Sequence, residues 1–302
     1  MVKRIVHFLI LIRWFHELLA LFPFVSISIL LFLIHGEYPE CAIPTFNFVV
    51  VAAGVLALMI PGFILNDLID LPIDRINKPY TLIAERVIPV HSVKRLFLVT
   101  LLVAVALSLY ITAFILPQWI WISVPVLLLS TLYDIFLKRM ALVGNIAIAL
   151  LGAGVPLVLL LLLPSCLEPF NAEALRALII VYTGFLFFIT IPRELSLDIS
   201  DMEGDRNAGC RTLPLIIGIK ASKIVVNGFI GLAIGASFIA MKEFAHFTWV
   251  LAACDVVFTY FAVKLWFVHQ RAEYIRLGRF LWIGMICGLL GCTVVTYLIL
   301  RT

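Results

Sequence analysis

The sequence predicts an all-α membrane protein in which one domain, residues 1–302, crosses the bilayer nine times. Three observations predict this class. Hydrophobic residues make up 64% of the chain and charged residues 13%, whereas a typical soluble domain has about 45–50% and about 25%. Nine apolar runs are close to or longer than the ~20 residues that a helix needs to cross a bilayer. Basic residues gather in the connections that would share one side of the membrane.

The apolar runs predict helices rather than strands. Each run is continuously apolar, whereas the strands of a membrane barrel would be short and alternating. The mean hydropathy of +1.15 excludes a disordered chain, a secreted disulfide scaffold and an ordinary cytosolic enzyme. The expected spans are about 7–35, 43–66, 94–116, 118–135, 140–163, 174–193, 221–241, 246–268 and 279–300.

The basic residues predict the orientation of the chain. If the nine spans alternate in direction, all but three of the 22 Lys and Arg residues fall on one side of the membrane. The positive-inside rule places that side in the cytoplasm, with the N-terminus inside and the C-terminus outside. The formal net charge of +4 is too small to indicate nucleic acid as a partner.

Two expected cytoplasmic connections carry dense acid. The first reads NDLIDLPIDR, residues 66–75, and follows the second span. The second reads RELSLDISDMEGDR, residues 193–206, and follows the sixth. In each motif three aspartates stand at i, i+3 and i+7, which is one face of a helix. Pro72 predicts a kink or a new helix start inside the first motif.

Repulsion among these carboxylates indicates a cation. Like charges on one helix face repel each other, and the cost rises near an apolar boundary because ionised carboxylates resist desolvation. Mg²⁺ prefers oxygen ligands and usually binds one or two carboxylates together with phosphate oxygens. We therefore expect two carboxylate clusters that hold Mg²⁺ and clamp a diphosphate. The alternative is that both motifs are solvated loop acids that balance nearby Arg and Lys.

The motifs resemble those of the UbiA superfamily of intramembrane prenyltransferases. Residues 66–74 match the pattern NDxxDxxxD at every fixed position, and residues 198–218 closely match DIxDxxGDRxxGxRTLPxxxG. Tyr133, Lys138 and the pair Gly144–Asn145 resemble a third family segment. The resemblance implies a single transmembrane prenyltransferase domain over residues 1–302. In that fold, nine transmembrane helices surround a central cavity with cytoplasmic acidic cap loops.

The resemblance also implies the roles of individual residues. Asn66, Lys138, Tyr133 and Asn145 would contact the substrate, and Mg²⁺ would be the cofactor. The catalytic set would be Asp70, Asp74, Asp198 and Asp201. The metal ligands would be Asp67, Asp70, Asp74, Asp198, Asp201 and Asp205.

One segment departs from the family pattern. After the first motif the family commonly has an Arg-Pro pair and then Gly-Arg, whereas this chain reads KPYTLIAER over residues 78–86. An arginine that usually binds diphosphate is therefore replaced. Lys78 or Arg86 would substitute for it, although a lysine is a point charge rather than a bidentate fork.

Ionisable residues within the expected spans are functional candidates. Arg13 and Glu17 are four residues apart and would either pair with each other or leave Arg13 to enter the cavity and meet an anionic substrate. Asp255 lies near the middle of the eighth span, where it would bind another helix or orient an acceptor. The glycines of Gly152–Gly154 and Gly288–Gly291 predict close helix packing.

These observations predict a membrane-embedded, Mg²⁺-dependent prenyltransferase. The donor would be a polyprenyl diphosphate such as geranylgeranyl diphosphate. The acceptor would be lipophilic: an aromatic quinone precursor and a glyceryl ether phosphate are equally open, and haem or chlorophyll precursors are further options. The rival interpretations are a transporter or channel for a cation or phosphorylated lipid, and a non-catalytic isoprenoid-binding protein. Transporters bind near the midplane, whereas these acids cluster at one rim.

Overall fold

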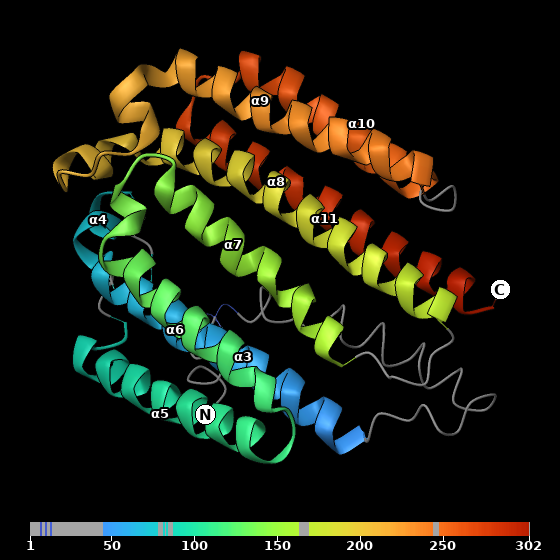
Figure 1. The fold of residues 1–302 in the computed structure, drawn as a ribbon. Helices are drawn as coiled ribbons and strands as arrows, with labels where there is room; N and C mark the ends of the chain where they lie inside the picture. The colour runs from blue at the N-terminus through green and yellow to red at the C-terminus, as the bar shows by residue number, and fades with distance from the viewer. Residues whose placement is uncertain are drawn as a thin grey trace.

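A computed structural model of the protein shows a bundle of long helices (Figure 1). It describes residues 7, 10, 13, 45–77, 81, 83, 87–162, 169–243 and 248–301. Within these residues every regular element is helical. The helices are α3 (Thr45–Ile69), α4 (Leu71–Asn77), α5 (Val90–Phe114), α6 (Ile120–Ile135), α7 (Val143–Leu157), α8 (Pro169–Asn207), α9 (Leu213–Glu243), α10 (Thr248–Lys264) and α11 (Arg271–Arg301). Short 3-10 turns join several of them: Pro117–Trp119, Leu137–Arg139, Val158–Leu161 and Leu265–Phe267.

The membrane class predicted from composition is confirmed. Seven segments of the described residues form helices long and apolar enough to cross a bilayer. Large apolar side chains also cover the outside of the bundle: Leu102, for example, is 60% exposed, and Phe114 is 76% exposed. Such extensive apolar surface is rare on soluble monomers and normal against lipid. The first expected span, 7–35, lies almost wholly outside the described residues, so the count of nine spans stays a prediction.

The helices form two groups joined by α7 (Figure 1). Helices α3, α5 and α6 pack together on one side, and α8, α9, α10 and α11 pack together on the other. Helix α7 contacts both α6 and α8. Each group has its own apolar core: Trp119 is fully buried among the first helices, and Phe258 and Phe261 are fully buried among the last.

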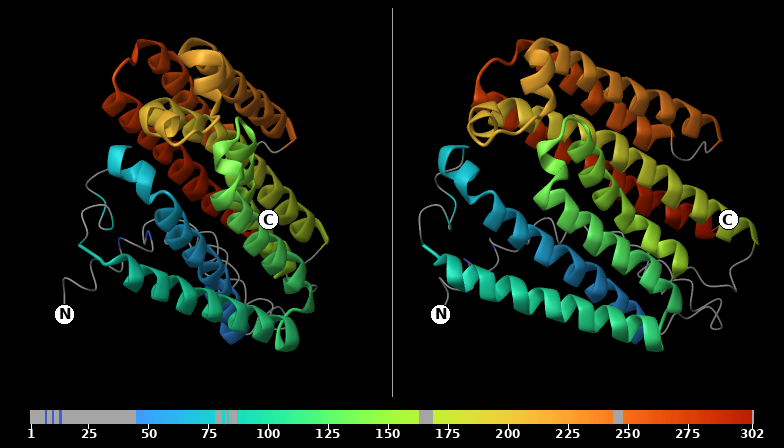
Figure 2. Two further views of the ribbon diagram at one scale, coloured as in Figure 1. Left: turned by 90° about the vertical axis from the view of Figure 1, so that its left-hand side faces the viewer. Right: turned by 60° about the vertical axis from the view of Figure 1, so that its left-hand side comes forward.

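One end of the bundle collects the connections that matter for the site. Helix α4, the α6–α7 connection, the end of α8 and the start of α11 all lie at this end (Figures 1 and 2). Short connections between antiparallel helices produce this arrangement. We call it the acidic end, because both aspartate motifs lie there.

The prediction that both aspartate motifs lie in cap loops is wrong for the second motif, which is part of helix α8. The second motif was expected in a connection after residue 193, but α8 continues unbroken to Asn207. Apolar residues on one face explain the continuation, since Leu195 is fully buried and Ile199 is 5% exposed. The motif is thus the last part of a long helix. Helix α9 also begins earlier than expected, at Leu213, and is kinked at Gly218, which has a φ of 78°.

The glycine runs differ in their packing. A Cβ on Gly291 would lie 2.0 Å from Cγ1 of Val250, so α10 and α11 approach each other closely there. The prediction of close packing is confirmed at this position. It is wrong at Gly152 and Gly154, where a Cβ would meet nothing within 4 Å.

We expect Gly291→Ala to lower thermal stability because its methyl group would force α10 away from α11. Overpacking of this kind costs about 1–3 kcal/mol. The matched control is Gly231→Ala in α9, where an added Cβ meets nothing within 4 Å. The midpoint of thermal unfolding in detergent should fall for Gly291→Ala and not for Gly231→Ala. Equal midpoints would contradict the close approach of the two helices.

Candidate active site at the acidic end

The first motif spans the junction of α3 and α4. The chain bends at Asp70, yet the Asp70 N–H donates to the Asn66 carbonyl at 2.8 Å and the Asp74 N–H donates to the Asp70 carbonyl at 2.7 Å. Pro72 is the second residue of α4, where its missing N–H has no helical partner to lose. The new helix start expected at Pro72 is confirmed.

Arg13 joins the first motif. Its guanidinium donates to Oδ1 of Asn66 at 3.0 Å and pairs with Asp67 at 2.9 Å. It also lies over the ring of Phe63, 5.1 Å from the centroid. Of the two interpretations of Arg13, this geometry favours the one in which it enters the site. Glu17, its alternative partner, lies outside the described residues.

Lys138 and Asp134 extend this cluster from α6 and the turn after it. The Lys138 ammonium lies 2.7 Å from Oδ1 of Asp70 and 3.8 Å from Oδ1 of Asp134. The amide of Asn66 donates to Asp134 at 2.9 Å. Asp134 was not among the predicted site residues. Its position as an acid at the end of an apolar span, four residues before a lysine, is the signal that would have found it.

Asn145 links α7 to the second motif. It is 6% exposed, and its amide donates to Oδ2 of Asp198 at 2.8 Å. A backbone bridge secures the same region, because the Arg211 N–H donates to the Arg139 carbonyl at 2.8 Å. The α6–α7 connection, which carries Lys138, is therefore fastened to the segment that follows the second motif.

Asp201 is held from α11. Arg271 donates through Nη2 to Oδ1 of Asp201 at 3.1 Å and through Nε to the Ser200 carbonyl at 2.9 Å. The Ser200 hydroxyl also lies 3.1 Å from Oδ1 of Asp201. Sequence reasoning missed Arg271 because it lies 70 residues away from Asp201 along the chain and outside every motif.

The remaining sequence-predicted residues lie at the same end of the bundle. Asp74 is on α4 and Asp205 near the end of α8, and both are half-buried. Tyr133 is half-buried near the end of α6, next to Asp134. Lys78 and Arg86, the proposed substitutes for the missing arginine, lie outside the described residues.

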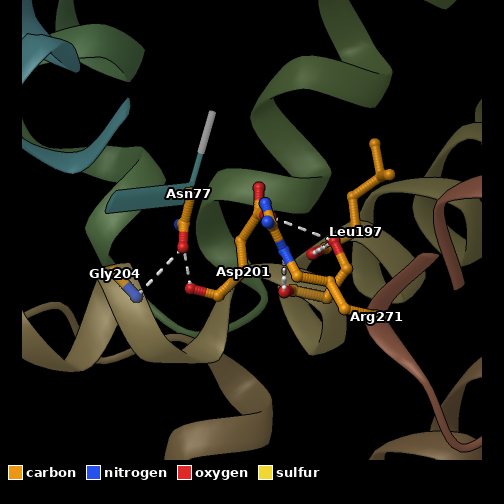
Figure 3. Close-up of polar contacts among 6 residues, drawn as sticks. Asn77, Leu197, Asp201, Gly204 and Arg271 are labelled. Carbon is orange, nitrogen blue, oxygen red and sulfur yellow. Dashed lines mark hydrogen bonds and ion pairs between the residues drawn. The ribbon is translucent and has the colours of Figure 1, made fainter. Parts of the chain in front are cut away.

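Two observations place the motifs next to each other. The side chain of Asn77 in α4 bonds to the backbone of α8 at Asp201 and Gly204 (Figure 3). Burial raises the pKa of the Cys210 thiol, and the negative charges of Asp205 and Asp70 raise it further. The two motifs are therefore neighbours at the acidic end. That all six aspartates form one site stays a prediction.

The donor set suits Mg²⁺ in type. Carboxylate oxygens are its preferred protein ligands, and one or two of them suffice when phosphate oxygens complete the shell. Among the described residues, no group of three or more His, Cys, Asp or Glu side chains is arranged to hold a metal ion. Four carboxylates instead have positive or amide partners: Asp67 with Arg13, Asp70 with Lys138, Asp198 with Asn145, and Asp201 with Arg271.

Comparison with known families supplies the identification. The profile of the UbiA prenyltransferase family matches residues 20–286. The chain belongs to this family. The predictions of the family and of a membrane prenyltransferase are thereby confirmed, and the match favours the enzyme over the transporter interpretation. The single domain over residues 1–302 and the roles of individual residues remain predictions.

Similar proteins share one name. Digeranylgeranylglyceryl phosphate synthase of Sulfolobus acidocaldarius is 29% identical over 70% of this chain and 72% of its own length. The synthase of that name from Thermococcus gammatolerans is 32% identical, with 68% of each chain covered.

Solved structures share the fold. A structure from work on digeranylgeranylglyceryl phosphate synthase in membranes has a TM-score of 0.66 and 22% identity, with 98% of this chain and 99% of that chain covered. A UbiA homologue from Archaeoglobus fulgidus bound to GPP and Mg²⁺ has a TM-score of 0.60 and 14% identity, with 95% and 99% covered. At these identities the likeness is one of fold.

We expect Lys138→Met to destabilise the protein, because it leaves Asp70 and Asp134 facing each other without the ammonium between them. Breaking a buried pair costs about 3–5 kcal/mol, and the partial exposure of Asp70 lowers this to about 2–3 kcal/mol. Adding Asp134→Asn removes one of the two charges and should restore part of the loss. Thermal unfolding in detergent measures both effects.

The matched control is Arg139→Met, because Arg139 is the exposed neighbour of Lys138. Its unfolding midpoint should stay close to that of the unchanged protein. An equal fall for Arg139→Met, or a double variant no more stable than Lys138→Met, would contradict the pairing.

Proposed function

We propose that this protein transfers a geranylgeranyl group from its diphosphate to a glyceryl ether phosphate with Mg²⁺ as cofactor. The observation that carries the proposal is the meeting of the two aspartate motifs at one end of an apolar bundle. An allylic diphosphate is itself an amphiphile, with a charged head and an apolar chain. The acidic end suits the head through metal ions, and the apolar body suits the chain.

The comparisons support one class of acceptor. Both relatives described above are named digeranylgeranylglyceryl phosphate synthase. A glyceryl ether phosphate therefore becomes the first candidate for this chain. An aromatic acceptor is the second candidate, since the chemistry at the donor carbon would be the same.

The donor head would be bound by both motifs. Asp70 and Asp74 with Asp198 and Asp201 would hold the metal, and Asp67 and Asp205 would complete the clusters. When bound, Mg²⁺ supplies Lewis-acid stabilisation of the negative charge on the departing diphosphate. The UbiA homologue structure with GPP and Mg²⁺ supports this chemistry for the fold.

Cationic side chains of this chain would bind the same diphosphate. Lys138 and Arg13 already lie among the carboxylates of the first motif, so they are placed to stabilise the leaving group as its bond to C1 lengthens. Lys78 or Arg86 would add to them. Asn145, which donates to Asp198 of the second motif, and Tyr133 would orient the donor head. Asn66 would fix its position against the first motif.

Exclusion of water decides the product. When the C1–O bond of the donor breaks, its electron pair leaves with the diphosphate and an allyl cation remains. The acceptor hydroxyl then bonds to C1 and gives up its proton, whereas water in its place would yield only the free prenyl alcohol. An apolar interior keeps water from the cation, and aromatic faces attract it.

The acidic end would face the cytoplasm. All but three of the basic residues, Arg176, Lys242 and Arg301, belong to connections on its side if nine spans are present. This orientation puts the N-terminus inside the cell and the C-terminus outside. The donor and acceptor would reach the site from the cytoplasmic leaflet.

We expect the purified protein with geranylgeranyl diphosphate, a geranylgeranyl glyceryl phosphate acceptor and Mg²⁺ to release pyrophosphate and form the diether product. EDTA should stop the reaction and excess Mg²⁺ should restore it. Asp70→Asn and Asp198→Asn should each lower the rate at least about 100-fold, because the leaving group loses electrostatic stabilisation. Product mass and pyrophosphate release are the measurements.

The matched control is Glu203→Gln, which neutralises an exposed acid within the second motif and should keep its activity. An aromatic acceptor run in parallel separates the two candidate acceptors. Prenylation of the aromatic compound alone would overturn the acceptor. Binding of the donor without pyrophosphate release with any acceptor would overturn the enzymatic function.

A further inference from the structure

Side chains from two other helices bond to the backbone of α8 inside the second motif. The Gly204 N–H donates to Oδ1 of Asn77 at 3.1 Å, and the Ser200 carbonyl accepts from Nε of Arg271 at 2.9 Å. The Asp201 carbonyl accepts from Nδ2 of Asn77 at 3.1 Å. Side chains from α4 and α11 thus bond to one turn of α8.

The contact with Asn77 is two-sided and buried. Its amide donates with one atom and accepts with the other, so both polar atoms of the side chain are used on α8. Asn77 is 3% exposed, which makes these bonds costly to lose. Figure 3 shows Asn77 between Gly204 and the backbone of Asp201, with Arg271 approaching from the other side.

Gly204 makes the contact possible. A Cβ at this position would lie 2.4 Å from Nδ2, 2.6 Å from Cγ and 2.7 Å from Oδ1 of Asn77. All three nearest atoms belong to that one side chain. Any residue larger than glycine at 204 therefore displaces the Asn77 amide from its bonds to α8.

We infer that Asn77 and Arg271 are positioning residues that clamp the second aspartate motif from two sides and set its distance from the first. Asn77 lies three residues after Asp74, so it ties the first motif to α8 directly. Arg271 fixes both the backbone and the carboxylate of the same turn. Neither residue has to touch the substrate. The inference rests on the proposed function only in taking these motifs as the diphosphate site.

Helix α11 presents Arg271 from a fastened start. Lys223 of α9 and Tyr274 of α11 both donate to the Val268 carbonyl, at 2.8 Å and 3.0 Å. Glu273 accepts from the N–H groups of His269 and Gln270 at 3.0 Å each. The connection before Arg271 is thereby held in place. The position of Arg271 is therefore fixed, and its bonds to Ser200 and Asp201 hold α8 in a defined place.

A double-mutant cycle tests the Asn77 side of the clamp. Asn77→Ala and Gly204→Ala should each raise the Mg²⁺ concentration for half-maximal rate and the KM for the donor by about 10- to 100-fold, the usual effect of losing a supporting partner of a metal ligand. The KM for the acceptor should stay unchanged. The double variant should be no worse than either single variant, because the added methyl group meets only the Asn77 side chain.

Hydrogen exchange of residues 198–206, measured on the full-length protein in detergent, is the second readout and needs no turnover. Exchange should be faster in both single variants, since this turn of α8 loses its bonds to the Asn77 side chain. Asn207→Ala, an exposed asparagine on the same helix, and Gly228→Ala, where a Cβ meets nothing within 4 Å, are the controls. They should change neither readout.

The Arg271 side is tested by Arg271→Lys, which keeps the charge and loses the two-pronged guanidinium. It should raise the donor KM and exchange at residues 198–206, whereas Arg276→Lys, an exposed arginine on α11, should not. Two results would contradict the clamp. One is that the effects of Asn77→Ala and Gly204→Ala on the donor KM add up in the double variant, and the other is that Asn77→Ala changes the donor KM and exchange no more than Asn207→Ala does. An unchanged protein that transfers no prenyl group would instead overturn the proposed function, and the exchange data would still decide the clamp.

Discussion

The concentration of carboxylates at one end of an apolar bundle is the constraint on which this structure depends. Half-buried carboxylates are costly unless each has a positive or hydrogen-bonding partner. Here the partners come from other elements: Arg13 for Asp67, Lys138 for Asp70, Asn145 for Asp198 and Arg271 for Asp201. Each pairing joins two segments that are far apart in the sequence. The same contacts therefore stabilise the carboxylates and hold the helix ends together.

This arrangement has a consequence for the proposed reaction. The cations that pair with the aspartates, and the amide that hydrogen-bonds to Asp198, are also the groups that would face a diphosphate. A donor that arrives with Mg²⁺ brings both signs of charge, so it can exchange partners with the existing pairs at little net cost in desolvation. A donor without metal would add negative charge to a site already rich in carboxylates. The charge of the site thus agrees with the Mg²⁺ dependence proposed for this protein.

The sequence was sufficient for features that repeat locally. Hydropathy predicted eight of the nine described helices, with shifted ends, and the i, i+3, i+7 spacing identified the aspartates of both motifs. It was insufficient where a residue acts through a distant partner. Asn77 bonds to a residue 127 positions away, and Arg271, the first residue of α11, belongs to no motif. Burial of Leu195 and Ile199 against other helices keeps the second motif helical. This burial could not be inferred from the sequence, because the residues around them are acidic.

Helix α4 shows why the two motifs need an external tie. It has seven residues, too few for a helix to be stable in isolation. Its direction is therefore set by what it packs against, and it packs against α8. Asp74 lies in the middle of α4, so the placement of this first-motif carboxylate depends on the contact that Asn77 makes with the second motif. The two motifs are then not independent sites on a rigid scaffold, because Asp74 of the first motif is positioned by the backbone of the second.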